Sequence, residues 1–199
     1  MADSTPNPRT GVLTGVRRRA ELLAALAQVF RERGYEGATL TELAAATGLG
    51  KASLYHHFPG GKAEMADALI RDAVAQARAR AFAHLQGPEP AAQRLQRFVS
   101  GFGDYLQAAN GPCLLGVLAM GSARQVHGEL LAAQFGEWRD ALAALFEEAG
   151  QKPKRAGRSA AEVLDTLYGA QMTAALLDDP KHFGRSLKRL ARRLDKTLG

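Results

Sequence analysis

The sequence predicts an all-α protein, and three of its features support this fold class. Apolar residues recur at steps of three and four along almost every segment, which is the spacing of one face of an α-helix. No segment sustains the alternation of apolar and polar residues that a β-strand would show. Stretches rich in glycine and proline separate the periodic segments, as at 87–90, 110–112 and 150–157. We expect a small N-terminal helical domain followed by a larger helical bundle.

The composition narrows the class of protein further. Of the 199 residues, 46% are hydrophobic and 23% are charged, a balance typical of a folded core rather than of disorder. The longest apolar runs, such as 113–120, are far shorter than the roughly 18 residues of a membrane-spanning helix. Residues 1–15 contain no apolar block of the kind found in signal peptides and should form a flexible basic arm. The single cysteine, Cys113, excludes an intramolecular disulfide, and a reducing, cytoplasmic setting is expected.

The first two helices are predicted over 16–33 and from about residue 40. Apolar residues, Leu26 and Phe30 among them, form one stripe along 16–33, and Gly34 should end that helix. Thr39 and Glu42 have the spacing of a capping box, which marks the start of the second helix.

A third short helix is predicted over 51–58, after the turn Gly48-Leu49-Gly50 and before Pro59-Gly60-Gly61. Two helices of about two turns joined by a glycine-bearing turn form a helix-turn-helix. Residues 16–61 are therefore predicted to be a three-helix, helix-turn-helix domain.

The remaining helices build the larger domain, 62–199. It begins with a long alanine-rich connecting helix over 62–85. Further helices are expected, in order, at about 91–109, 113–124, 127–149, 159–178 and 181–197.

The stretch 39–62, TLTELAAATGLGKASLYHHFPGGK, closely resembles the DNA-binding signature of the TetR/AcrR family of transcriptional regulators. The resemblance covers residues 17–70 well, and the rest of the chain only in the number and length of its helices. The matching features include Phe30, Gly34-Tyr35, Gly48 and the Leu-Tyr-His-His-Phe block at 54–58. It implies a DNA-binding transcriptional regulator whose second domain binds a small molecule and forms a homodimer.

Helix 51–58 has the properties of a recognition helix. Leu54 and Phe58 lie four residues apart and can anchor it to the core, which leaves small and polar side chains outside. Lys51 can bond guanine, Ser53 a range of acceptors, and the Ala52 methyl group can meet a thymine methyl group. The resemblance implies that Thr39, Tyr55, His56 and Lys62 hold the phosphate backbone. Gly50 stands where the family usually has a serine, so that phosphate contact is not expected. The predicted DNA-binding residues are Arg17, Arg18, Thr39, Lys51, Ala52, Ser53, Tyr55, His56 and Lys62.

Other chemistries find little support in the sequence. The segment Gly48 to Ser53 fails as a phosphate-binding loop, since Ala45 and Ala52 occupy positions that need glycine and a hydroxyl group. His56 and His57 point about 100° apart on a helix and lack a third ligand, so no metal site is expected. No constellation of polar residues suggests an enzyme or a cofactor.

The second domain holds most of the aromatic and large apolar residues, some of which should line an effector pocket. The predicted pocket residues are Phe98, Phe102, Tyr105, Leu114, Leu118, Gln125, Phe135, Trp138, Tyr168, Gln171 and Met172. By resemblance the last two helices form the dimer contact, with the predicted residues Leu164, Leu167, Ala175, Leu187, Leu190 and Leu194. Cys113 lies at a predicted helix N-terminus, where a lowered pKa would make it a redox or electrophile sensor; an inert buried thiol is the alternative.

Charge alone does not identify the DNA-binding part. The net charge of +6 is made of +3 in residues 1–62, −3 in 63–150 and +6 in 181–199. A second interpretation is therefore a helical adaptor that uses its basic C-terminal helix on membranes or acidic partners. The motifs favour a ligand-responsive repressor that binds a palindromic operator as a dimer and is released by a small molecule. Its expected partners are double-stranded DNA, a small-molecule effector and a second copy of the chain, and no membrane is expected.

Overall fold

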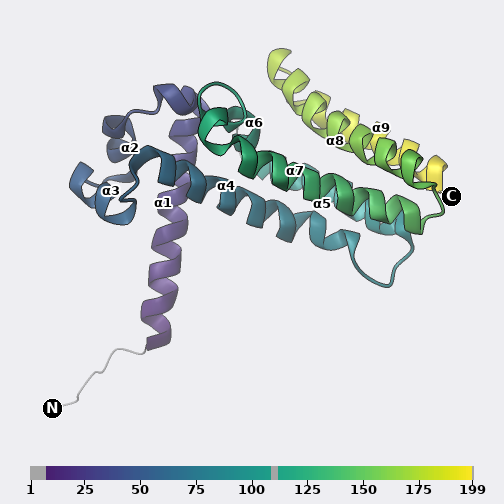
Figure 1. Ribbon diagram of the computed structural model, residues 1–199, viewed down its shortest axis with the longest axis horizontal. Coiled ribbons are helices and arrows are strands. Elements are labelled where there is room, and N and C mark those ends of the chain that lie inside the picture. Colours follow the sequence, from purple (N-terminus) through teal and green to yellow (C-terminus); the bar gives the residue numbers. More distant parts are fainter. Residues whose placement is uncertain (1–7, 109–111, 199) are drawn as a thin grey trace.

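The computed structural model describes residues 8–108 and 112–198, and for residues 8–17, 197 and 198 it describes the backbone alone. Helices make up almost all of these residues, and no strand occurs among them (Figure 1). The helices are α1 (Pro8–Gly37), α2 (Leu40–Thr47), α3 (Lys51–His57), α4 (Gly61–Arg80), the 3-10 helix η1 (Phe82–Leu85), α5 (Ala91–Ala108), α6 (Leu114–Leu118), α7 (Ala123–Glu148), α8 (Pro153–Leu176) and α9 (Pro180–Leu198).

Helix α1 is longer than the sequence indicates. It begins at Pro8, inside the segment 1–15 that was expected to be a flexible arm, and proline is well suited to the first turn of a helix. Residues 1–7 of that arm lie outside the described residues. Gly34 kinks the chain with φ 69° and ψ 179°, a conformation open almost only to glycine. The regular part of α1 thus ends where the sequence predicted.

The helix-turn-helix is confirmed at α2 and α3. Thr39 and Glu42 form the predicted capping box, and Gly48 ends α2 in the left-handed conformation with φ 67°. Leu26, Phe30, Leu43 and Leu54 are fully buried and join the three helices in one core.

Four predicted helix boundaries in the larger domain are wrong. Helix α4 ends at Arg80, and a 3-10 turn replaces its last predicted residues. The expected helix 113–124 is a short α6 that stops at Leu118, and α7 already begins at Ala123. Gly121 takes a positive φ of 66°, and this turn separates the two helices. Helix α8 begins at Pro153, six residues before the predicted start.

The larger domain is a bundle in which α7, α8, α9 and α5 pack side by side (Figure 1). Helix α9 is basic on its outer face, whereas Phe183, Leu190 and Leu194 on its inner face are buried against the bundle. Helix α4 runs from the helix-turn-helix to the bundle and contacts both. Within the described residues, no helix is long and apolar enough to cross a membrane.

Candidate nucleic-acid interface

Helix α3 presents nearly all of its surface to solvent. Of its residues only Leu54 is buried, and Phe58, which directly follows the helix, is also buried. The residues predicted to read bases, Lys51, Ala52 and Ser53, are exposed. Two apolar anchors therefore hold a helix whose other side chains are all available to a partner.

The start of α3 lacks a side-chain cap. Gly50 takes the extended N-cap conformation and makes no side-chain hydrogen bond there. Among the described residues, no hydrogen-bond or ion-pair partner is found for the Lys51 ammonium group. The first turn of α3 thus offers free backbone N–H groups and a free cation, both of which favour phosphate or a base acceptor.

Three predicted phosphate-binding residues surround one hollow of about 510 Å³, which Thr39, Tyr55 and Lys62 line together with Gly60 and Gly61. We call it the phosphate hollow. The Tyr55 side chain is 46% exposed, and a Cβ atom added to Gly61 would lie 3.5 Å from its ring, so the ring lies against the start of α4. The structure thus brings the ends of α2, α3 and α4 together around one open hollow, which Glu36 also lines.

Lys62 and Thr39 are less free than the sequence suggested. The Lys62 ammonium group donates to the carbonyl oxygen of Tyr35 at 2.8 Å and lies 4.7 Å from the centre of the Tyr35 ring. The Thr39 hydroxyl group donates to Glu42 at 3.0 Å and accepts from the Glu42 N–H at 3.2 Å. Lys62 therefore fastens the end of α1 to α4, and Thr39 serves as a helix cap. Tyr55 is the residue of the three whose side chain remains available.

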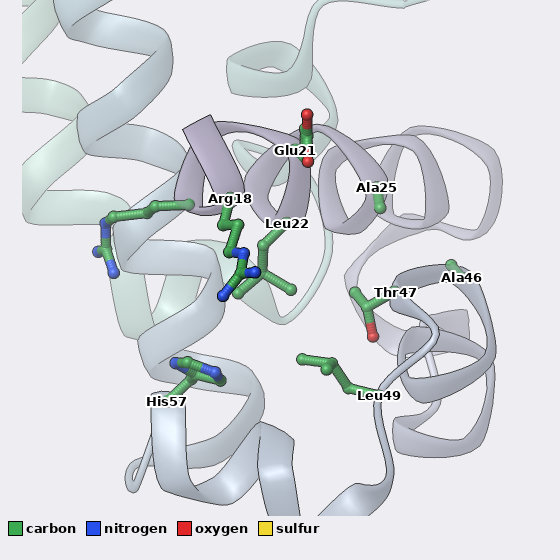
Figure 2. Close-up of a pocket in the computed structure, with 9 residues that line it drawn as sticks. Arg18, Glu21, Leu22, Ala25, Ala46, Thr47, Leu49 and His57 are labelled. Carbon is green, nitrogen blue, oxygen red and sulfur yellow. The ribbon is translucent and has the colours of Figure 1, made fainter. Parts of the chain in front are cut away.

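A second feature of the domain was missed by the sequence analysis. A groove of about 770 Å³ runs between α1, the end of α2 and the end of α3. Figure 2 shows Arg18 directed toward His57 across this groove, with Leu22 beside Arg18 and Leu49 on the far wall. His57 was placed on the outer surface but given no role. The signal in the sequence is that His57 is a polar residue of helix 51–58 outside the anchor pair Leu54 and Phe58.

The remaining predicted DNA contacts are partly described. Arg18 and His56 are exposed. The Arg17 side chain lies outside the described residues.

The comparisons with known proteins agree with this geometry. The family model for bacterial regulatory proteins of the tetR family matches residues 22–69, which include α2, α3 and most of the core that holds them. These residues therefore form a DNA-binding domain of the tetR type. The chain is 26% identical to the uncharacterized HTH-type transcriptional regulator Rv0196 of Mycobacterium tuberculosis over 84% of its own length and 88% of that protein. It is 46% identical to the transcriptional repressor KstR2 of the same species over 54 residues, which are 27% of this chain and 26% of that protein.

The fold extends this similarity to the second domain. A TetR transcriptional regulator from Chloroflexus aurantiacus superposes with a TM-score of 0.73 and 26% identity, covering 92% of this chain and 96% of that one. Several curated relatives match only through the helix-turn-helix, and those matches span about a quarter of the relatives' own length. The chain thus has a helix-turn-helix domain similar to those of known repressors.

The predicted effector residues differ in how the bundle places them. Most are in an aromatic cluster, in which Phe102 and Phe135 each contact both Trp138 and Tyr168 at ring-centre distances of 5.0–6.4 Å. Phe98 and Tyr105 contact Phe102 in the same cluster. Leu114 and Leu118 are buried on α6, and Gln171 is half-buried on α8. Gln125 and Met172 are exposed, so their assignment to an interior pocket is wrong for this conformation.

Two buried polar groups in this region bear on effector binding and sensing, the Trp138 indole N–H group and the Cys113 thiol. The Trp138 Nε1–H group is buried and has no hydrogen-bond partner among the described residues. Cys113 is buried next to Tyr168, and burial raises the pKa of its thiol, whereas a sensor cysteine needs a lowered pKa. The described residues also contain no group of three or more histidine, cysteine or acidic side chains that would hold a metal ion.

The predicted dimer residues mostly lie inside the protomer. Leu164, Leu167, Leu190 and Leu194 are buried, and Leu187 is half-buried and lies close to Gly103 of α5. Ala175 is exposed on α8. The sequence pattern found the apolar faces of α8 and α9 correctly, but the bundle itself covers most of them.

Proposed function

We propose that the protein is a ligand-responsive repressor that binds a palindromic operator as a homodimer. The observation that carries this proposal is the free surface of α3, held by Leu54 and Phe58, beside the phosphate hollow. A recognition helix of this kind reads bases in the major groove while neighbouring helix ends hold phosphates. Repression then follows from occupation of the promoter.

Dimerisation is supported by the exposed apolar residues that the bundle leaves on α8. Met172 is 50% exposed and Leu176 is 78% exposed, and Ala175 lies between them. Beside them, a groove of about 460 Å³ between α8 and α9 is lined by small residues such as Gly169 and Ala170. Small residues let a second helix approach closely, so we assign the contact between copies to this surface.

Communication between the domains is supported by two contacts that reach α7 and the turn before it. The buried His127 of α7 bonds through Nδ1 to an oxygen of Asp67 on α4 at 2.8 Å. The Glu36 carboxylate at the end of α1 accepts a hydrogen bond from the N–H of Ser122. A small molecule bound among the aromatic residues of the bundle would act on α7 and, through these contacts, on α4 and α1. A coupling of about 1–3 kcal/mol is enough for a 5- to 150-fold change in operator affinity.

The rival function, a membrane or adaptor role for α9, has less support. A helix that binds a membrane surface needs a free apolar face. In α9 that face is packed against α5 and α8, and only the basic side is exposed. An acidic partner is the remaining form of this rival.

The test is binding to a fluorescent duplex that carries the promoter next to the protein's own gene, at several salt concentrations. Wild type should bind saturably and resist competitor DNA, with an affinity that falls steeply as salt rises. Tyr55→Ala should lose most of this binding. The matched control removes basic charge from α9 by Arg185→Ala with Arg192→Ala, and it should bind as wild type does. Loss of binding in the α9 variant, with no change in Tyr55→Ala, would refute the repressor and support the rival.

A further inference from the structure

A cleft at the junction of the two domains has no role in the functions above, although two of the predicted effector residues, Tyr105 and Leu114, line it. It has a volume of about 300 Å³ and lies between α1, α4, α5 and α6. Its floor is apolar and includes Leu23, Leu69 and Leu114, all of them buried. Polar side chains, among them Arg31 and Arg80, line the rest. We call it the junction cleft.

The two arginines of the junction cleft make no ion pair with the described residues, since no carboxylate oxygen among those residues lies within ion-pair distance of either guanidinium group. The Arg31 Nε–H group is buried and has no hydrogen-bond partner in the same part of the chain. A buried donor without an acceptor costs free energy, so it indicates a group that is missing from its surroundings.

The polar side chains that line the cleft give it a positive net charge. Asp72 is the acidic residue that lines it, and its carboxylate accepts from the Gln76 amide at 2.7 Å. Two guanidinium groups against one carboxylate give a net charge of +1. Tyr105 adds a hydroxyl group that burial keeps in its neutral, donating form, since burial raises its pKa.

Size and lining together define the ligand. A cleft of about 300 Å³ is at the small end of ligand pockets, and its volume equals that of about ten water molecules. Its floor suits a hydrocarbon body, and its two guanidinium groups suit a planar anion. We propose that the junction cleft binds a small amphipathic monocarboxylate of about ten non-hydrogen atoms, with its carboxylate between Arg31 and Arg80 and its body on the leucine floor.

Such a ligand would join the two domains directly. Arg31 belongs to α1 of the DNA-binding domain, and Arg80 is the last residue of α4. A carboxylate that bonds both would favour one placement of α1 on α4. The effect on operator affinity rests on the proposed function, but the binding itself does not.

The binding test uses the full chain with octanoate and phenylacetate as probes, and with octanamide and phenylacetamide as uncharged controls of the same size. Isothermal titration calorimetry measures each affinity. At least one acid should bind at millimolar or lower concentration and about tenfold or more tightly than its amide, because the amide lacks the charge that the guanidinium groups recognise. Equal binding of acid and amide, or no binding of either acid, would overturn the proposal.

Variants locate the site. Arg80→Gln is exposed and should keep the fold but lose about tenfold or more in affinity for the acid. Ala24→Phe fills the cleft from an exposed position of α1 and should abolish binding. Arg78→Gln is the matched control, since Arg78 lies outside the cleft and faces Glu137. Wild-type affinity in both Arg80→Gln and Ala24→Phe would show that the acid binds elsewhere. Acid binding without any operator binding in wild type would refute the repressor and leave this site intact.

Discussion

The close contact between α4 and α5 predicts that replacing Gly101 by alanine destabilises the protein, although alanine is the better helix former. Gly101 lies on α5 directly against the end of α4. A Cβ atom at this position would lie 1.9 Å from the carbonyl oxygen of Arg80 and 3.0 Å from its carbonyl carbon. Both obstacles are backbone atoms, which cannot rotate away as a side chain would. Gly101→Ala therefore forces the two helices apart by about 1 Å or more, because non-bonded carbon atoms are best separated by about 3.5–4.0 Å.

The magnitude follows from two opposing contributions. Alanine is the better helix former, and by itself it would stabilise an exposed helix by about 1 kcal/mol relative to glycine. Overpacking of a tight contact costs about 1–3 kcal/mol and occasionally more, and a backbone obstacle belongs at the upper end of that range. We expect a net loss of about 2 kcal/mol, which lowers the melting temperature by about 4–8 °C in a chain of this length.

Gly136→Ala is the matched control, because Gly136 lies within α7 and a Cβ atom there would meet no atom within 4 Å. It should gain up to about 1 kcal/mol from helix propensity. Urea denaturation followed by circular dichroism measures both variants. Their difference cancels the propensity effect and should be about 3 kcal/mol. If Gly101→Ala were as stable as Gly136→Ala, the close approach of α4 and α5 would not exist in solution.

Four further predictions concern the interface, the thiol, the dimer and pH. Lys51→Ala should lower operator affinity by about 5- to 150-fold with little change in stability. Leu54→Ala, at a buried position, should instead lose about 2–5 kcal/mol of unfolding free energy. Equal melting temperatures for the two variants would contradict the assigned anchor. Since burial raises the pKa of the Cys113 thiol, this group should react with Ellman's reagent far more slowly in folded protein than in urea, and equal rates would restore the sensor hypothesis. Leu176→Glu should convert the dimer to a folded monomer in light scattering, Val126→Glu on α7 serving as the exposed control, and a persistent dimer would exclude this face of α8. Hydrogen bonds from Ser122 lower the pKa of Glu36, so the stability that this contact contributes should be present above the ordinary pKa of 4.5 and be lost as pH falls through the lowered value. The difference in stability between wild type and Glu36→Gln should therefore vanish in acid. A difference that grew in acid would contradict this contact.

The DNA-binding domain was predictable because its signals are local. A capping box, a left-handed glycine and an anchor pair four residues apart each involve neighbours in sequence. The capping box at Thr39, the turn at Gly48 and the anchors Leu54 and Phe58 all occur as predicted. Their geometry is decided within one or two helical turns, so distant parts of the chain have little influence on it.

The side chains that join distant helices were not predictable in this way. Lys62 occupies a position that resembles a phosphate ligand, yet its ammonium group bonds to a carbonyl group 27 residues earlier in the chain. Leu190 and Leu194 form an apolar stripe that suits a dimer, yet α5 and α8 cover it within one protomer. Periodicity identifies which face of a helix is apolar, but only the tertiary arrangement determines what covers that face.

Helix α4 links the two domains, and its contacts differ in strength along its length. At its end, Gly101 lies against the Arg80 backbone, a contact that cannot adjust without moving a helix. Nearer its start, Asp67 is partly exposed and holds His127 through one hydrogen bond. An effector that breaks this bond would therefore turn α4 about its Arg80 end. Because α4 has 20 residues, it is about 30 Å long, and a rotation of about 5° moves its start by about 2.5 Å. In the proposed dimer, opposite shifts of the two recognition helices would change their separation by about 5 Å, against half-sites spaced about 34–36 Å apart.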